Sequence, residues 1–173
     1  MKKAKRFLVL KNLARSKMVK VALIRIRGEI GLDKQIKRTL KLLHLYKKHV
    51  CSIVDNTDDY VGMLKKVKDY ITWGELDKDT FKLLLEKRGK LMKKQQLEEK
   101  YLKEKTGFNV EQFASEFISG KQDLKNVPGL KQFFRLMPPK GGFERGGIKK
   151  SFAMGGALGY RKEKINELIK KMI

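Results

Sequence analysis

The sequence is poor in residues that could form disulfides or bind metals. Cys51 is its only cysteine, so no internal disulfide can form and nothing calls for an oxidising compartment. The two histidines, His44 and His49, lie near Cys51, but three candidate ligands at this spacing match no zinc pattern. We therefore expect a small buried cysteine, one histidine at a helix end and one entering a strand, with no metal and no cofactor.

Long apolar runs are also missing. The basic start at residues 2–6 is similar to the charged region of a signal peptide, but the apolar run that follows spans only residues 7–10. No segment approaches the length of apolar sequence that a membrane span needs. We expect a soluble, cytoplasmic protein without a membrane partner.

Acidic residues are scarce relative to basic ones. The chain has 42 Lys and Arg against 19 Asp and Glu, a net charge of +23 on 173 residues. Residues 1–27 contain ten basic residues and no acid, and residues 125–173 contain twelve basic and three acidic residues. An ordinary solvated surface intersperses acids with bases, as residues 28–124 do. The two basic ends therefore predict a polyanionic partner.

Nucleic acid is the better of two such partners. Anionic lipid would also attract the basic ends, but Pro138, Pro139 and the glycines between positions 141 and 159 interrupt the C-terminal one. No continuous amphipathic helix can therefore span this end and lie on a membrane. With 41% hydrophobic residues, the chain can still bury a core, so it is more than a disordered basic tail.

Hydrophobic periodicity predicts a β-α-β-α-β unit over residues 19–76. Two amphipathic helices separate three expected strands, at residues 21–27, 50–54 and 70–76. Such a unit folds as a small sheet with both helices on one face and the other face open. Alternation along the first strand places Arg25 and Arg27 on a basic face, away from the core.

A helical extension is expected after residue 76, with a glycine-rich loop at residues 140–151. The loop lacks the spacing of a nucleotide-binding phosphate loop. Its glycines would nevertheless let the backbone approach a sugar-phosphate surface, and its cations supply charge at the same place. We expect the loop to contact RNA and to depend on RNA for its order, because its sparse apolar residues bury little surface.

Two aromatic residues near this loop, Phe143 and Phe152, allow two interpretations. Each could stack on an unpaired base, or pack as a hydrophobic peg into its own protein. The sequence favours neither interpretation.

Several segments, taken together, resemble one known family. In chain order they are residues 22–28, 39–43, 63–75, 155–161 and 165–169. The set is similar to large-subunit ribosomal protein L thirty in its archaeal form, and to eukaryotic L seven, from about residue 19 onward. The resemblance implies a ferredoxin-like, three-stranded sheet with its first strand central. It also implies large-subunit rRNA, near 5S rRNA, and neighbouring ribosomal proteins as partners.

The sequence thus predicts an α+β protein in three parts: a basic N-terminal extension (1–18), the β-α-β-α-β core (19–76) and a helical extension (77–173). We expect a non-enzymatic structural constituent of the large ribosomal subunit, located in the ribosome and without a small-molecule substrate. The alternative is a free RNA- or DNA-binding protein, such as an RNA chaperone or a nucleoid protein. The residues expected to bind RNA are Arg25, Arg27, Arg38, Arg88, Lys140, Gly141, Gly142, Arg145, Lys149, Lys150 and Arg161.

Overall fold

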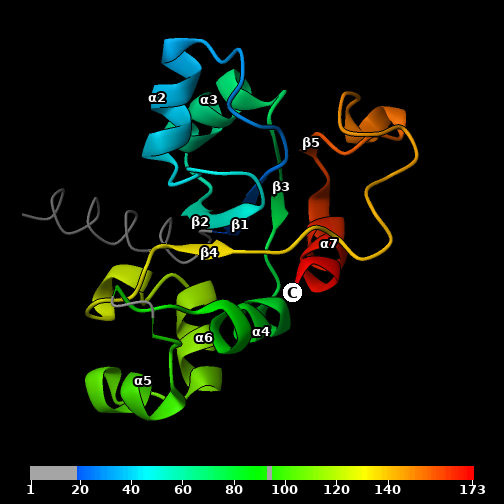
Figure 1. The fold of residues 1–173 in the computed structure, drawn as a ribbon. Coiled ribbons are helices and arrows are strands. Elements are labelled where there is room, and N and C mark those ends of the chain that lie inside the picture. Colours follow the sequence, from blue (N-terminus) through cyan, green and yellow to red (C-terminus); the bar gives the residue numbers. More distant parts are fainter. Residues whose placement is uncertain (1–18, 93–94) are drawn as a thin grey trace, which may run out of the picture.

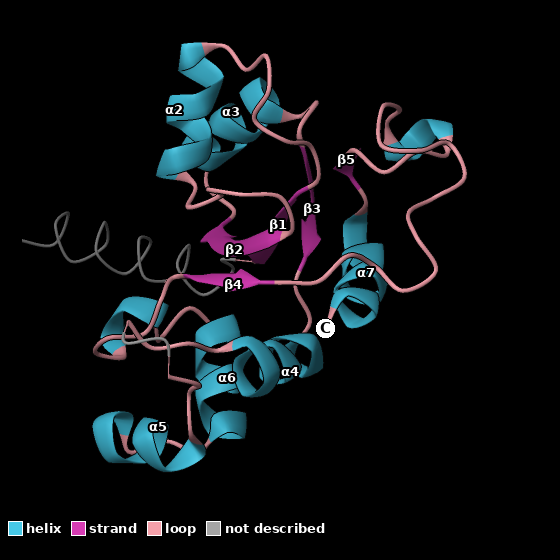
Figure 2. Ribbon diagram, viewed as in Figure 1, coloured by secondary structure: helices cyan, strands magenta, loops and turns pink. Residues whose placement is uncertain are grey.

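A five-stranded sheet forms the centre of the fold, in the order β4-β2-β1-β3-β5 (Figure 2). The computed structural model describes residues 19–92 and 95–173, so the expected N-terminal extension lies outside the described residues. The central strand pairs antiparallel with both of its neighbours. These three strands are β1 (Lys20–Arg25), β2 (Val50–Asp55) and β3 (Ile71–Glu75). The predicted β-α-β-α-β unit with its first strand in the middle is confirmed.

Two helices cover one face of the sheet, as the sequence predicts. They are α2 (Lys34–Leu42) and α3 (Asp58–Val67), which lie side by side above the strands in Figure 1. The α3 helix begins where the Thr57 side chain accepts a hydrogen bond from the backbone N–H of Tyr60, satisfying one otherwise unpaired donor. The apolar side chains of both helices pack on Val21 and Leu23 of β1.

Three further helices pack against the opposite face, so the expected open face is wrong. These are α4 (Lys78–Arg88), α6 (Val110–Ile118) and α7 (Ile165–Met172) (Figure 1). Their core includes Ala22 and Ile24, which alternate with Val21 and Leu23 along β1. A strand that is buried on both faces has apolar residues at successive positions. The run from residue 21 to residue 24 is such a sequence.

The extension also supplies both edges of the sheet. The β4 strand (Phe133–Arg135) pairs antiparallel with β2, and β5 (Gly159–Tyr160) pairs parallel with β3. The predicted sheet of three strands is therefore short by two. Strands of three and two residues are too short to show the alternation on which the prediction rests.

The remaining helix, α5 (Glu99–Thr106), lies farther from the sheet and ends at Gly107, whose φ of 74° is left-handed. A buried cation joins β1 to the extension: Nζ of Lys20 lies 2.7 Å from Oδ1 of Asp55 and 3.0 Å from Oδ1 of Asp123.

Among the helices of residues 19–92 and 95–173, none is long and apolar enough to cross a membrane.

Candidate nucleic-acid interface

The glycine-rich loop lies beyond the edge strand β5 (Figure 1). It begins beside the end of α7, where the backbone N–H of Lys140 donates a 2.9 Å hydrogen bond to the carbonyl oxygen of Lys171. All four cations of the loop are exposed: Lys140, Arg145, Lys149 and Lys150. The loop thus presents positive charge to solvent, as the sequence predicts.

Backbone hydrogen bonds within the protein tie the loop to residues 155–158. The N–H of Gly146 donates to the carbonyl of Gly155 at 2.9 Å. The N–H groups of Ala157 and Leu158 donate to the carbonyls of residues 147 and 150 at 3.1 and 3.2 Å. The loop and the following turn therefore form one hydrogen-bonded unit. This support comes from backbone groups, whereas the sequence argument considered only buried apolar surface.

Internal packing explains part of the glycine content. A Cβ atom on Gly146 would lie 2.6 Å from the carbonyl oxygen of Gly155, and one on Gly156 would lie 2.2 Å from that of Lys150. Gly141 and Gly142 are different, because both are exposed, with left-handed φ values of 80° and 77° and open space at the Cβ position. Gly147 also has open space at its Cβ position but is half-buried, so Gly141 and Gly142 are the loop glycines most accessible to another molecule.

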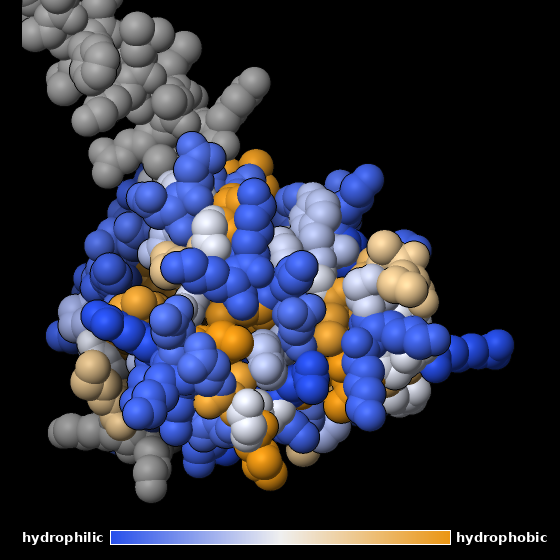
Figure 3. All heavy atoms as spheres, turned by 90° about the horizontal axis from the view of Figure 1, so that it is seen from above, coloured by the Kyte–Doolittle hydropathy of each residue, from blue (hydrophilic) through white to orange (hydrophobic). Residues whose placement is uncertain are grey.

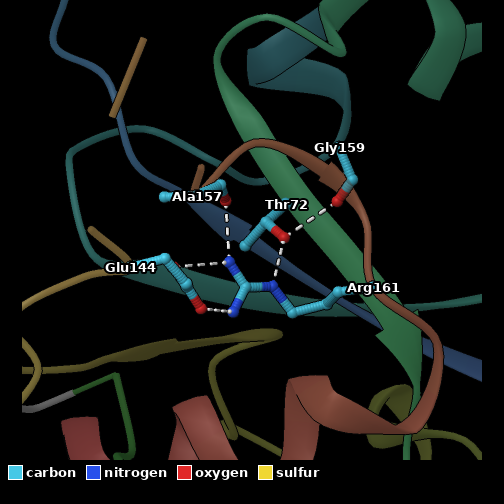
Figure 4. Close-up of polar contacts among 5 residues, drawn as sticks. All are labelled: Thr72, Glu144, Ala157, Gly159 and Arg161. Carbon is cyan, nitrogen blue, oxygen red and sulfur yellow. Dashed lines mark hydrogen bonds and ion pairs between the residues drawn. The ribbon is translucent and has the colours of Figure 1, made fainter. Parts of the chain in front are cut away.

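Arg161, which the sequence predicts to bind RNA, is instead an internal connector between the loop and the sheet. Arg161 is only 2% exposed. Its NH1 and NH2 groups lie 2.5 and 3.3 Å from the two carboxylate oxygens of Glu144 (Figure 4). Nε donates to Oγ1 of Thr72 on β3 at 2.8 Å, and NH2 donates to the carbonyl of Ala157 at 2.8 Å. The Arg161 side chain thus fixes the position of the loop relative to β3.

Arg25 is also inside the protein, so its expected place on an exposed basic face is wrong. Arg25 is only 1% exposed. Its guanidinium donates four hydrogen bonds of 2.9 to 3.0 Å to backbone carbonyl oxygens, those of Arg27, Gly28, Leu45 and Tyr46. Burial lowers the pKa of Arg25, with a smaller opposing effect from the charge of Glu29. The side chain therefore joins the end of β1 to the segment after α2.

The other predicted residues are scattered over the surface. Arg38 is exposed on α2, and Arg27 is half-buried, with its guanidinium 5.1 Å from the centre of the Tyr70 ring. Figure 3 shows that hydrophilic side chains dominate the face over α2 and α3. Arg88 lies at the end of α4, on the other side of the sheet, and NH2 of its side chain donates a 2.6 Å hydrogen bond to the carbonyl oxygen of Ile173.

The two histidines and the cysteine are found as predicted. His44 follows the end of α2 in a left-handed conformation, and His49 directly precedes β2. Cys51 is fully buried, and its burial raises the pKa of the thiol to about 12. In the part of the chain that the structure describes, no three His, Cys, Asp or Glu side chains are grouped so that they could hold a metal ion.

The structure places the two aromatic residues, Phe143 and Phe152, in different environments. Phe143 is partly buried and packs against the core beneath the sheet and against Ile26, so it is a hydrophobic peg. Phe152 begins a short 3-10 turn, Phe152–Met154, and lines a surface cavity. Exposed cations on a hydrogen-bonded loop of a small α+β fold form the kind of surface with which basic proteins recognise nucleic acid by charge and shape.

Comparisons with known proteins define the family. The model of the family "Ribosomal protein L30p/L7e" matches residues 21–71. Large ribosomal subunit protein uL30 of Methanococcus maripaludis is 47% identical over 152 residues, which cover 88% of this chain and 98% of that protein. The uL30 protein of Nanoarchaeum equitans is 49% identical over 157 residues, covering 90% of this chain and 100% of that protein. This chain therefore belongs to the uL30 family of large ribosomal subunit proteins.

A third relative gives the same result: uL30 of Methanopyrus kandleri is 45% identical over 149 residues, covering 86% of this chain and 100% of that protein. These relatives confirm the resemblance drawn from the sequence motifs. They also confirm the predicted class, a non-enzymatic structural constituent of the large ribosomal subunit.

Proposed function

We propose that this protein holds large-subunit rRNA through its phosphates and shape, with the glycine-rich loop as the main contact. The observation behind this proposal is that four exposed cations lie on a loop whose backbone is hydrogen-bonded and whose Glu144 is paired with Arg161. A cation on a loop that is held by hydrogen bonds loses less conformational freedom on binding than a cation on a flexible chain. Phosphates are dense enough on folded RNA to engage several such cations at once.

The proposed contact surface differs from the full set of residues expected from the sequence. It includes the four loop cations, Gly141 and Gly142, and extends to Arg27 and Arg38 at the sheet end near α2. It leaves out Arg25 and Arg161, because their N–H groups are already paired inside the protein. Arg88 contributes less, because part of its guanidinium is bonded to the carbonyl of Ile173.

Replacing the four loop cations with serine tests the proposal. Incorporation of this variant into large subunits should fall, while its thermal unfolding stays near that of the parent, because these side chains are exposed. A matched control replaces four exposed lysines on and after α5, namely Lys100, Lys103, Lys105 and Lys121. Both variants lose the same charge. Equal loss of incorporation in both would show that net charge matters and the position of the loop does not.

Salt dependence provides a second test. If about six phosphates are contacted, affinity for large-subunit rRNA should fall roughly a thousandfold between 50 and 200 mM salt. The loop variant should show a shallower slope, because it neutralises fewer phosphates. A flat salt response of the parent protein would contradict the proposal.

Sedimentation tests whether the protein acts within the assembled large subunit. The protein should follow the large subunit through a magnesium-containing gradient at ribosomal stoichiometry, whereas a free factor would remain at the top. Cross-linking within the assembled subunit would then map the contacts. We expect these near 5S rRNA and on adjoining ribosomal proteins.

A further inference from the structure

A surface cavity beside β5 has the size and chemistry of a small-molecule or nucleobase site. Its volume is about 630 Å³, within the usual range of ligand pockets. It lies between the 3-10 turn at Phe152–Met154 and the turn at Lys162–Lys164 that leads into α7. Phe152, Ala153 and Tyr160 contribute apolar surface to its lining, and the exposed Lys162, Glu163 and Lys164 line it as well.

Phe152 is held by cations and has no place in the buried core of the described residues. The guanidinium carbon of Arg161 lies 4.7 Å from the centre of the Phe152 ring, and Nζ of Lys164 lies 5.9 Å from it. The same ring also borders a second hollow, of about 270 Å³, that includes Gly141, Gly142 and Lys171. Phe152 is therefore a partly exposed aromatic side chain with cations beside its ring.

Tyr160, which lines the same cavity, is fixed by its hydroxyl group. The hydroxyl donates to Oε1 of Glu75, and this hydrogen bond is the main reason that the pKa of Tyr160 rises to about 12. The other carboxylate oxygen of Glu75 is buried and has no hydrogen-bond partner within residues 19–92 and 95–173. The hydroxyl group thereby holds the Tyr160 ring in place beside the cavity.

We propose that this cavity receives one unpaired base of the rRNA, which stacks on the aromatic ring of Phe152 with Tyr160 as its second wall. The inference rests on the proposed function, because the base must belong to the RNA strand held by the loop. Aromatic side chains provide a stacking surface for unpaired bases, and neighbouring lysines neutralise the phosphates that flank the base. Lys162 and Lys164 are exposed and line the cavity, where such phosphates would lie.

The test measures the affinity of the full-length protein for two ligands. One is a ten-nucleotide single-stranded RNA of mixed sequence, and the other is an oligomer of the same length and charge built from abasic units. The parent should bind the RNA roughly tenfold more tightly or better, because stacking adds to the phosphate contacts. The ratio should persist as salt rises, because both ligands release similar numbers of counterions.

Substitutions locate the source of this ratio. Phe152→Ala and Phe152→Leu should both reduce it to near one without changing affinity for the abasic oligomer; leucine keeps apolar contact with Arg161 but has no aromatic face. Tyr160→Ala should lower the ratio, and Tyr160→Phe should keep it. The matched control is Tyr46→Ala, since Tyr46 is 41% exposed, like Tyr160 at 47%, but packs on Phe133 at the opposite edge of the sheet.

Two results would overturn the inference while leaving the proposed function intact. One is equal affinity of the parent for the two oligomers, and the other is a ratio that survives all substitutions of Phe152 and Tyr160. If the parent bound neither oligomer nor large-subunit rRNA, the proposed rRNA binding would fail together with the cavity.

Discussion

Arg161 and Glu144 form a two-pronged ion pair that joins the glycine-rich loop to the sheet (Figure 4). The arginine comes from the end of β5, and the carboxylate comes from the loop, 17 residues earlier in the chain. Thr72 and the carbonyl of Ala157 each accept one further N–H group of the arginine. The ion pair thereby orients the two residues on either side of Glu144. Phe143 points inward, and Arg145 points toward solvent.

The first prediction concerns this pair. Glu144→Gln should lower the free energy of unfolding by about 2 kcal/mol, less than is usual for a fully buried pair, because the Glu144 side chain remains 29% exposed. The loss arises because the buried Arg161 charge loses its partner. Urea unfolding measures it. Glu104→Gln, which breaks the exposed pair with Lys105, is the control and should cause no measurable change. Similar losses in both would show that the Arg161 pair contributes little.

The second prediction contrasts two arginines that lie two positions apart. Arg25→Ala should cost on the order of 3 kcal/mol of stability, because several buried carbonyl groups lose a charged donor. Arg27→Ala should leave stability nearly unchanged and weaken rRNA binding. Chemical denaturation and filter binding measure the two effects. If Arg25→Ala weakened RNA binding while leaving stability intact, the assignment of Arg25 to the interior would be wrong.

The third prediction concerns stability at high pH. Burial raises the pKa of Cys51 from 9.0 to about 12, so between these values the unfolded chain loses this proton while the folded chain keeps it. Stability due to the neutral thiol is present below pH 9.0 and declines as pH rises to about 12. The slope should be up to about 1.4 kcal/mol per pH unit steeper than in Cys51→Ala, which keeps every other titrating group. Parallel slopes of the two proteins would contradict the burial of this thiol.

The fourth prediction concerns the order of the loop in the free protein. The N–H groups of Gly146, Ala157 and Leu158 should exchange slowly with solvent deuterium without RNA, because all three are hydrogen-bonded. Gly156→Ala should abolish this protection, since its Cβ would meet the Lys150 carbonyl at 2.2 Å. The control is Gly62→Ala in α3, where the Cβ meets nothing and alanine should stabilise the helix by up to about 1 kcal/mol. Rapid exchange of all three amides in the parent would show that the loop depends on RNA after all.

Much of the local structure was predictable from neighbouring residues. The three central strands and the helices between them follow from apolar residues at periods of 2 and 3.6, which act over a few positions. The positions of His44, His49 and Cys51 also follow from these elements. The short edge strands β4 and β5 could not be predicted, because their pairing partners are β2 and β3, more than 75 residues away in the chain.

The sequence by itself determined the charge of the protein, the elements of its core and, through ordered motifs, its family. The tertiary structure alone decided which cations face solvent. Arg25 and Arg27 look alike in the sequence, but the carbonyls of Leu45 and Tyr46 reach only Arg25. Arg145 and Arg161 look alike as well, and only Arg161 meets Glu144 and Thr72. A guanidinium is buried where the folded chain brings enough acceptors around it to replace water, and those acceptors come from residues distant in the sequence.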